Sequence, residues 1–158
     1  MTATKPSYVY VTYIVTTPEK VWQALVDVDM MRQYWVGVAT GPARANVSDW
    51  KVGSRWEHQR MDGTATVDMA GTVLEIEPPR RLVMSWARPA EEADPSKHGK
   101  LTFEVEPQPS GVVRLTILHE DLDEKMHAGI SNGWPMILSN LKTLLETGHP
   151  LPRAAAAS

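Results

Sequence analysis

The sequence predicts an α+β helix-grip fold, in which a curved antiparallel sheet of six or seven strands wraps around one long C-terminal helix. Three observations indicate this fold. Strand-like segments follow one another with short turns between them, two short helical segments follow the first strand, and the strongest apolar helix pattern stands at the end. Strands joined by short turns run antiparallel. The apolar helix face then needs one sheet face to cover it.

The strands are predicted from β-branched and alternating segments that are bounded by glycine and proline turns. Asp62-Gly63 is the strongest hairpin signal, and Gly71 inside a strand indicates a bulge or a close backbone approach. A polar, acidic loop is expected before the sixth strand. The expected strands cover residues 8–15, 43–47 (within an irregular segment, 37–52), 54–61, 64–77, 80–87, 100–106 and 112–119.

Two short helices are expected directly after the first strand. Thr17 can accept a hydrogen bond as the N-terminal cap, and Pro18 suits the first helical position. Asp27 and Asp29 interrupt this helix, so a second short helix is expected over residues 30–34.

The last helix has the clearest apolar face. Proline is tolerated only in the first turn of a regular helix, so Pro135 predicts a start near Asn132. Gly148 is a typical C-terminal stop. The apolar residues that follow helical spacing are Ile130, Trp134, Ile137, Leu138, Leu141, Leu144 and Leu145.

Composition limits the classes of function. The length of 158 residues suits one domain, 1–158, with an ordered core over about 8–151. There is no cysteine, and no spacing of ligands that suggests a metal, so neither a metal nor another cofactor is expected. A net charge of -3 argues against nucleic acid as a partner. Without a signal peptide or an apolar span, the sequence predicts a cytoplasmic protein that does not insert into membranes.

Alternation along the strands predicts which side chains face the long helix and could line a cavity between helix and sheet. A mostly apolar cavity of about 300 Å³ or more with a few polar groups would be the usual shape of a small-molecule site. The expected lining residues are Trp35, Trp56, His58, Met84, Trp86, Phe103, Ile117, His119, Trp134 and Leu138.

Four titratable residues are candidates for chemistry. His58 and His119 could act as polar anchors or as acid and base, since imidazole titrates near neutral pH. The simpler interpretation, which we favour, is a strand-end histidine bonded to solvent or backbone. Glu75 and Asp68 could be buried carboxylates with a raised pKa, although pairing with a nearby arginine is the commoner situation.

Four segments resemble the bacterial relatives of the C-terminal domain of the activator of the ninety-kilodalton heat-shock-protein ATPase. This family belongs to the START and birch-pollen-allergen-like superfamily, so the resemblance implies the helix-grip fold over about residues 8–151. The superfamily includes lipid carriers, hormone receptors and polyketide cyclases, and fold alone does not select among them. The segments are residues 13–22 (YIVTTPEKVW), 48–54 (SDWKVGS), 71–75 (GTVLE) with 78–82 (PPRRL), and 132–135 (NGWP) with 141–148 (LKTLLETG).

The resemblance leaves three functions open. We favour a module that binds a small hydrophobic or amphipathic molecule, without turnover. The second is a cyclase- or dehydratase-type enzyme that uses the same cavity. The third is a chaperone co-factor or stress-response partner, which would expose an apolar patch around Trp35, Val36 and Trp50. Such a patch could also form a homodimer, so a monomer and a homodimer both remain open.

Overall fold

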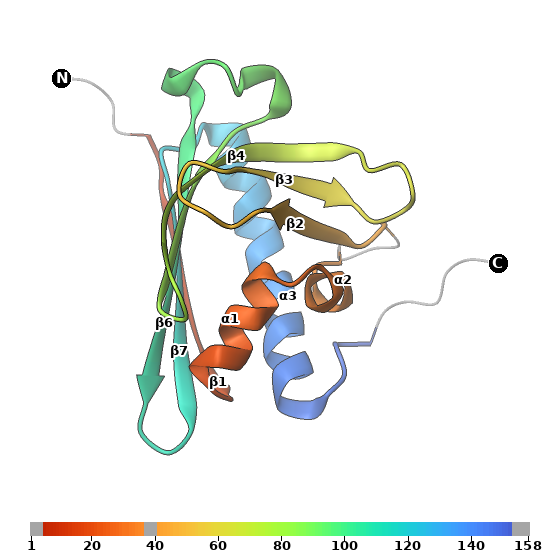
Figure 1. Ribbon diagram of the computed structural model, residues 1–158, viewed down its shortest axis with the longest axis vertical. Coiled ribbons are helices and arrows are strands. Elements are labelled where there is room, and N and C mark those ends of the chain that lie inside the picture. Colours follow the sequence, from red (N-terminus) through yellow and green to blue (C-terminus); the bar gives the residue numbers. More distant parts are fainter. Residues whose placement is uncertain (1–4, 37–40, 153–158) are drawn as a thin grey trace.

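The computed structural model describes residues 5–36 and 41–152, and it confirms the helix-grip architecture (Figure 1). In these two ranges the α-helices are α1 (Pro18–Val26), α2 (Val28–Tyr34) and α3 (Glu124–Thr147). The loop before the sixth strand forms two short 3-10 turns, η1 (Pro89–Glu91) and η2 (Pro95–Lys97). The strands are β1 (Tyr8–Val15), β2 (Arg44–Ser48), β3 (Arg55–Arg60), β4 (Val67–Glu77), β5 (Arg81–Trp86), β6 (Gly99–Gln108) and β7 (Val112–Glu120).

All seven strands form one antiparallel sheet in the order β1-β7-β6-β5-β4-β3-β2. The strands β2 to β7 therefore make a meander, and β1 joins its end beside β7. The sheet curves as a half-barrel around α3, and α1 and α2 lie on the same concave side (Figure 1). Residues 37–40 of the expected irregular segment lie outside the described residues.

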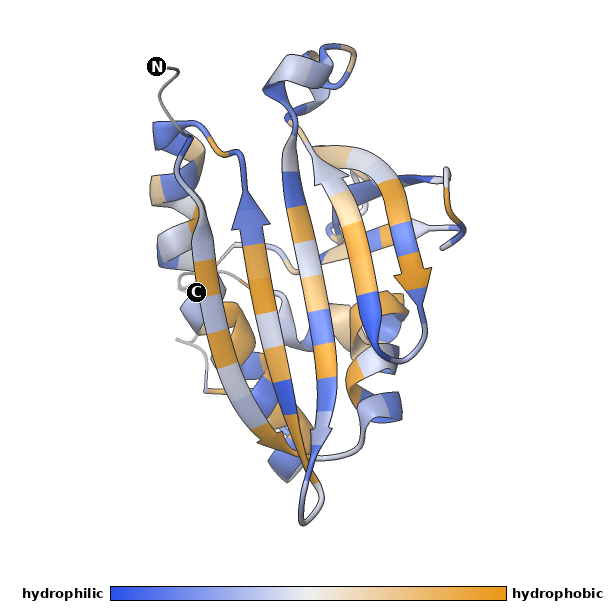
Figure 2. Cartoon of the chain, turned by 90° about the vertical axis from the view of Figure 1, so that its left-hand side faces the viewer, coloured by the Kyte–Doolittle hydropathy of each residue, from blue (hydrophilic) through white to orange (hydrophobic). Residues whose placement is uncertain are grey.

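The alternation predicted for the strands is present in the structure. Along β7 every second residue is buried, including Leu115 and Ile117, and the residues between them are half-buried. Figure 2 shows the convex side, where apolar and polar residues alternate along the strands. The buried members of β5, β6 and β7 form the core against α1 and α3. The sheet thus provides a continuous apolar wall for whatever lies between it and α3.

The two short helices follow from their caps. The Thr17 hydroxyl accepts a hydrogen bond from Lys20 N at 3.3 Å, and Pro18 begins α1 as expected. Asp27 ends α1 and also caps α2, because its carboxylate accepts from Met30 N at 3.2 Å. The second helix is therefore two residues longer at its start than the sequence predicted.

The predicted start of the last helix near Asn132 is wrong. The helix α3 begins at Glu124, because Asp123 caps it by accepting from Met126 N at 2.7 Å. Pro135 consequently lies inside the helix. An internal proline costs about 3 kcal/mol. Contacts of the earlier turns offset this cost, among them a hydrogen bond between His127 Nε2 and Ser7 O at 3.1 Å.

The hairpin signal at Asp62-Gly63 was correct, but the strand after it begins at Val67 rather than Thr64. The Asp62 carboxylate accepts hydrogen bonds from the backbone and the hydroxyl of Thr64. These bonds hold the chain in a local turn, so six residues, 61–66, connect β3 and β4.

Gly71 marks the close approach that the sequence predicted. A Cβ at this position would meet the carbonyl oxygen of Ser85 and would lie 2.7 Å from Trp56 Nε1. The Trp56 indole crosses β4 here and donates to Ser85 O at 2.8 Å. The glycine thus lets β3 and β5 be tied together across β4.

Candidate functional site

A pocket of about 220 Å³ lies between the N-terminal half of α3 and the concave side of β3, β4 and β5. Its lining is mainly aromatic and apolar, with one imidazole. Four of the predicted lining residues contribute to it: Trp35, His58, Trp86 and Trp134. The sequence did not predict the other six, which are Met69, Met126, Gly129, Ile130, Gly133 and Ile137.

The pocket is smaller than the roughly 300 Å³ expected for a cavity between helix and sheet. The difference arises because the remaining predicted residues pack as core beneath the pocket and do not line it. Each of them is at most 2% exposed: Trp56, Met84, Phe103, Ile117, His119 and Leu138.

Aromatic rings contribute much of the pocket wall. The Trp35 ring lies 5.3 Å from that of Trp134 and 4.8 Å from His58, measured between centroids. The rings of Trp86 and His119 form a T-shaped pair with their centroids 4.7 Å apart. The indoles of two of these tryptophans already donate hydrogen bonds: Trp86 Nε1 to the Met126 sulfur at 3.4 Å, and Trp134 Nε1 to His119 Nδ1 at 3.2 Å.

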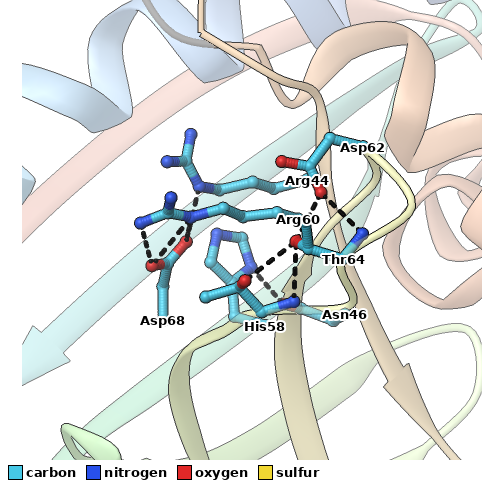
Figure 3. Close-up of polar contacts among 8 residues, drawn as sticks. Arg44, Asn46, His58, Arg60, Asp62, Thr64 and Asp68 are labelled. Carbon is cyan, nitrogen blue, oxygen red and sulfur yellow. Dashed lines mark hydrogen bonds and ion pairs between the residues drawn. The ribbon is translucent and has the colours of Figure 1, made fainter.

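His58 is the titratable side chain among the pocket residues. It lies opposite Asn46 in the register of β2 and β3, and its Nδ1 is 2.7 Å from Asn46 Oδ1 (Figure 3). Both side chains are buried. Burial, and to a smaller extent the positive charge of Arg44, lowers the pKa of His58 to about 4. The imidazole is therefore neutral at physiological pH.

His119 does not lie at a wet strand end as we expected. It is fully buried, and its Nδ1 accepts from Trp134, so the hydrogen of the neutral ring is on Nε2. Burial lowers the pKa of His119 to about 3. Nε2 has no hydrogen-bond partner among the described residues.

Neither carboxylate candidate reaches the pocket. Asp68 is held by Arg44 and Arg60, each at 2.9 Å, on the rim beside β2 and β3 (Figure 3). The Arg60 guanidinium keeps the pKa of Asp68 below its ordinary value, so the commoner situation of pairing with an arginine holds here and the alternative of a raised pKa does not. The side chain of Glu75 is 54% exposed and pairs with Arg81 at 3.2 Å. The convergence of carboxylate and imidazole that an acid–base pair needs is absent from these residues.

The prediction of an exposed apolar patch around Trp35, Val36 and Trp50 is also wrong. Trp35 and Val36 are buried, and Trp50 is half-buried against the core. Trp35 directly follows α2, and its ring packs against the rings of His58 and Trp134 rather than facing outward. Within residues 5–36 and 41–152, no group of three or more acidic, histidine or cysteine side chains could hold a metal ion. No helix in these ranges is long and apolar enough to cross a membrane.

Five of the six unpredicted pocket residues lie on α3, and two of them, Met126 and Gly129, belong to turns that the proline argument had left outside the helix. Gly129 and Gly133 are one helical turn apart, and no atom outside the helix backbone would meet a Cβ on either of them within 4 Å. The four-residue spacing of two glycines before Trp134 was the available signal, since it leaves open space on one helix face.

Comparison with known proteins gives one family. The sequence model of the family described as "Activator of Hsp90 ATPase homolog 1-like protein" matches residues 15–146. No curated protein sequence matches this chain.

Several solved structures share the fold. ChR145 from Cytophaga hutchinsonii is 26% identical, with a TM-score of 0.68 over 91% of this chain and 96% of that protein. CalU16 from Micromonospora echinospora is 20% identical, with a TM-score of 0.68 over 92% of this chain and 77% of CalU16. PFC0360w from Plasmodium falciparum, described as an HSP90 activator, is 20% identical with a TM-score of 0.69 over 91% and 97% of the two chains.

Proposed function

This chain belongs to the family of Activator of Hsp90 ATPase homolog 1-like proteins, and we propose that it binds a small hydrophobic or amphipathic molecule in the pocket between α3 and the sheet. The observation that supports this most directly is the lining of the pocket. Three indoles and several methionine and isoleucine side chains surround one neutral imidazole. This combination of apolar walls with a single polar group is typical of small-molecule sites.

Tryptophan fluorescence tests the proposal, because Trp35, Trp86 and Trp134 lie at the pocket. The protein is titrated with fatty acids, polyketides and small aromatic compounds after native mass spectrometry has shown whether a ligand co-purifies. We expect a saturable change in emission with one of these classes.

A pair of variants on neighbouring residues of α3 gives the control. Gly133→Leu places an isobutyl group in the pocket, whereas Asn132→Leu adds the same group at an exposed position. We expect the first to abolish the saturable change and the second to leave it intact. A flat response across the whole panel, with a clean apo mass, would count against ligand binding.

Family membership also favours a second function, stimulation of a ninety-kilodalton chaperone ATPase. It is tested by adding the protein to the cognate chaperone and measuring ATP hydrolysis. Unchanged hydrolysis, together with a pull-down that retains no chaperone, would argue against this function.

A cyclase- or dehydratase-type activity has less support. Such reactions need at least two positioned titratable groups. Of the described residues that line the pocket, His58 alone is titratable, and its pKa of about 4 makes it a weak base.

A further inference from the structure

We propose that His58 is the specificity-determining residue of the pocket, and that it selects neutral one- or two-ring aromatic molecules carrying a hydrogen-bond donor, such as phenols and indoles. This inference rests on the proposed binding function and names the class of ligand.

The hydrogen bond between His58 and Asn46 has a defined direction. The Asn46 carbonyl oxygen faces Nδ1 at 2.7 Å, and a carbonyl oxygen can only accept. Nδ1 therefore donates, and the lone pair of the neutral ring is on Nε2. Because Asn46 and His58 are 1% and 5% exposed, water does not compete freely for this bond. The asparagine thus fixes Nε2 of His58, a residue that lines the pocket, as a hydrogen-bond acceptor.

Nε2 of His58 remains an acceptor across the physiological pH range. Protonation would turn Nε2 into a donor, but burial and the adjacent Arg44 oppose a positive charge on the ring. Asp68, the acidic group near it, is already shared between Arg44 and Arg60. Among the described residues, the imidazole of His58 makes one hydrogen bond, through Nδ1, so Nε2 is left for a ligand.

The other residues of the pocket wall also determine which ligands bind. Among the residues that the structure describes, no lysine, arginine or acidic side chain lines the pocket. A carboxylate ligand would therefore lose its hydration without gaining an ion pair, which disfavours fatty acids. Of the wall indoles, those of Trp86 and Trp134 already donate within the protein. The remaining surface of the wall is mainly flat rings and thioethers, which suit an aromatic ligand.

The size of the ligand follows from the volume. A pocket of 220 Å³ corresponds to about seven water volumes. One ring or two fused rings fill such a space, whereas a sterol or a long acyl chain would extend beyond it.

Matched ligand pairs test the inference. The ligands are 2-naphthol against 2-methoxynaphthalene and indole against 1-methylindole, each titrated into the ¹⁵N-labelled protein and followed by amide chemical shifts. Methylation removes the donor and keeps the rings. We expect the donor of each pair to bind about tenfold more tightly, as befits one buried hydrogen bond.

Two variants assign the preference to His58. His58→Phe keeps a ring against Trp35 and should bind both members of each pair equally. If this variant does not fold, Asn46→Asp serves instead. An aspartate at this position would hold a proton on the imidazole, so that Nε2 becomes a donor that either naphthalene oxygen can accept, and the preference for 2-naphthol over 2-methoxynaphthalene is lost. Long-range ¹H–¹⁵N spectra of the unliganded protein should show the hydrogen of His58 on Nδ1.

The outcomes separate the two proposals. Equal affinity within each pair for the unaltered protein, or a hydrogen on Nε2, overturns the inference and leaves ligand binding intact. Absence of binding by all four probes overturns the inference, and absence of any ligand across the wider panel overturns the proposed function as well.

Discussion

The addition of a single methyl group at Gly71 should be among the more destabilising changes in this protein. Its Cβ would collide with the Ser85 carbonyl and displace the Trp56 indole that donates to it. Overpacking of this kind costs about 2–3 kcal/mol. We expect Gly71→Ala to lower the free energy of unfolding by that amount, measured by urea denaturation.

Gly129→Ala is the matched control for this change. It adds the same methyl group inside a helix where no atom outside the helix backbone lies within 4 Å. Alanine is favoured over glycine in helices by about 1 kcal/mol, so this variant should be more stable than the unaltered protein. Equal destabilisation by both substitutions would show that the contact at Gly71 is not what matters.

The two buried histidines predict how stability depends on pH. Their pKa values are lowered to about 4 for His58 and about 3 for His119, while an unfolded histidine titrates near 6.5. Between these values the unfolded chain binds more protons than the folded protein. The contribution of the two neutral histidines to the free energy of unfolding should therefore be complete above pH 6.5. It should be lost as the pH drops toward 4, by about 3 kcal/mol per histidine at most.

Urea unfolding at pH 7, 5.5 and 4.5 measures this dependence. His119→Phe should flatten the curve, because it removes one of the two titrating groups. Asp123 does not interfere, since its carboxylate, whose pKa Arg88 lowers to about 2, loses its contribution only below about pH 4. An identical pH dependence in the variant would contradict the role given to His119.

Individual residues of the site could be predicted where the alternation along a strand determines which face of the sheet a side chain occupies. His58, Trp86 and His119 were assigned to the concave face from their strands, and all three lie there. The burial of His119 could not be predicted, because its place at the end of a strand suggested a bond to solvent or backbone. Trp134 of α3 covers the ring instead.

At the scale of elements, the first turn of α3 depends on Asp123. Its carboxylate accepts from Met126 N and also pairs with Arg88 at 2.7 Å. Loss of an N-terminal cap costs about 1 kcal/mol. We expect Asp123→Ala to destabilise the protein by that amount, since the ion pair is half-exposed and adds little.

Glu124→Ala provides the comparison in the same turn. Glu124 is exposed and contributes mainly through the helix dipole, which is worth a few tenths of a kcal/mol. Thermal unfolding of both variants measures the difference, and a larger loss for Glu124→Ala would be inconsistent with capping by Asp123.

The start of α3 was the main element that sequence reasoning misplaced. The proline rule is a statement about an isolated helix, in which nothing offsets the missing hydrogen bond at Pro135. Here Asp123 caps the start of the helix. Met126 and His127 form hydrogen bonds to residues outside the helix. Such long-range contacts cannot be read from a local pattern, whereas the strands, whose turns are local, were predicted to within a few residues.

At the scale of the whole molecule, β1 is an open edge of the sheet. Its outward residues Val9, Val11, Tyr13 and Val15 are 37–63% exposed. Two side chains of α3 occupy the edge: Lys142 donates to Tyr13 O at 2.6 Å, and Glu146 accepts from Val15 N at 2.8 Å. Charged groups at an exposed edge hinder pairing with the edge of another molecule.

Removal of this protection should promote self-association. We expect the double variant Lys142→Ala, Glu146→Ala to form dimers or larger species in sedimentation velocity at concentrations where the unaltered protein has a smaller mass. The double variant Glu19→Ala, Lys20→Ala removes the same charges from α1 and should behave like the unaltered protein. Identical sedimentation of all three would mean that the edge is protected in another way.

Pro135 also divides α3 into two halves, and we expect their hydrogen bonds to differ in lifetime. It leaves the Ser131 carbonyl without its helical donor. The half before it holds two glycines and most of the pocket wall on α3, while the half after it anchors Leu138, Leu141 and Leu144 in the core. Deuterium should therefore replace amide hydrogens sooner in residues 126–134 than in residues 138–146. A bound molecule that bridges the first half to the sheet should slow exchange there alone, and the speed at which this half-helix lifts would set how fast the molecule enters and leaves.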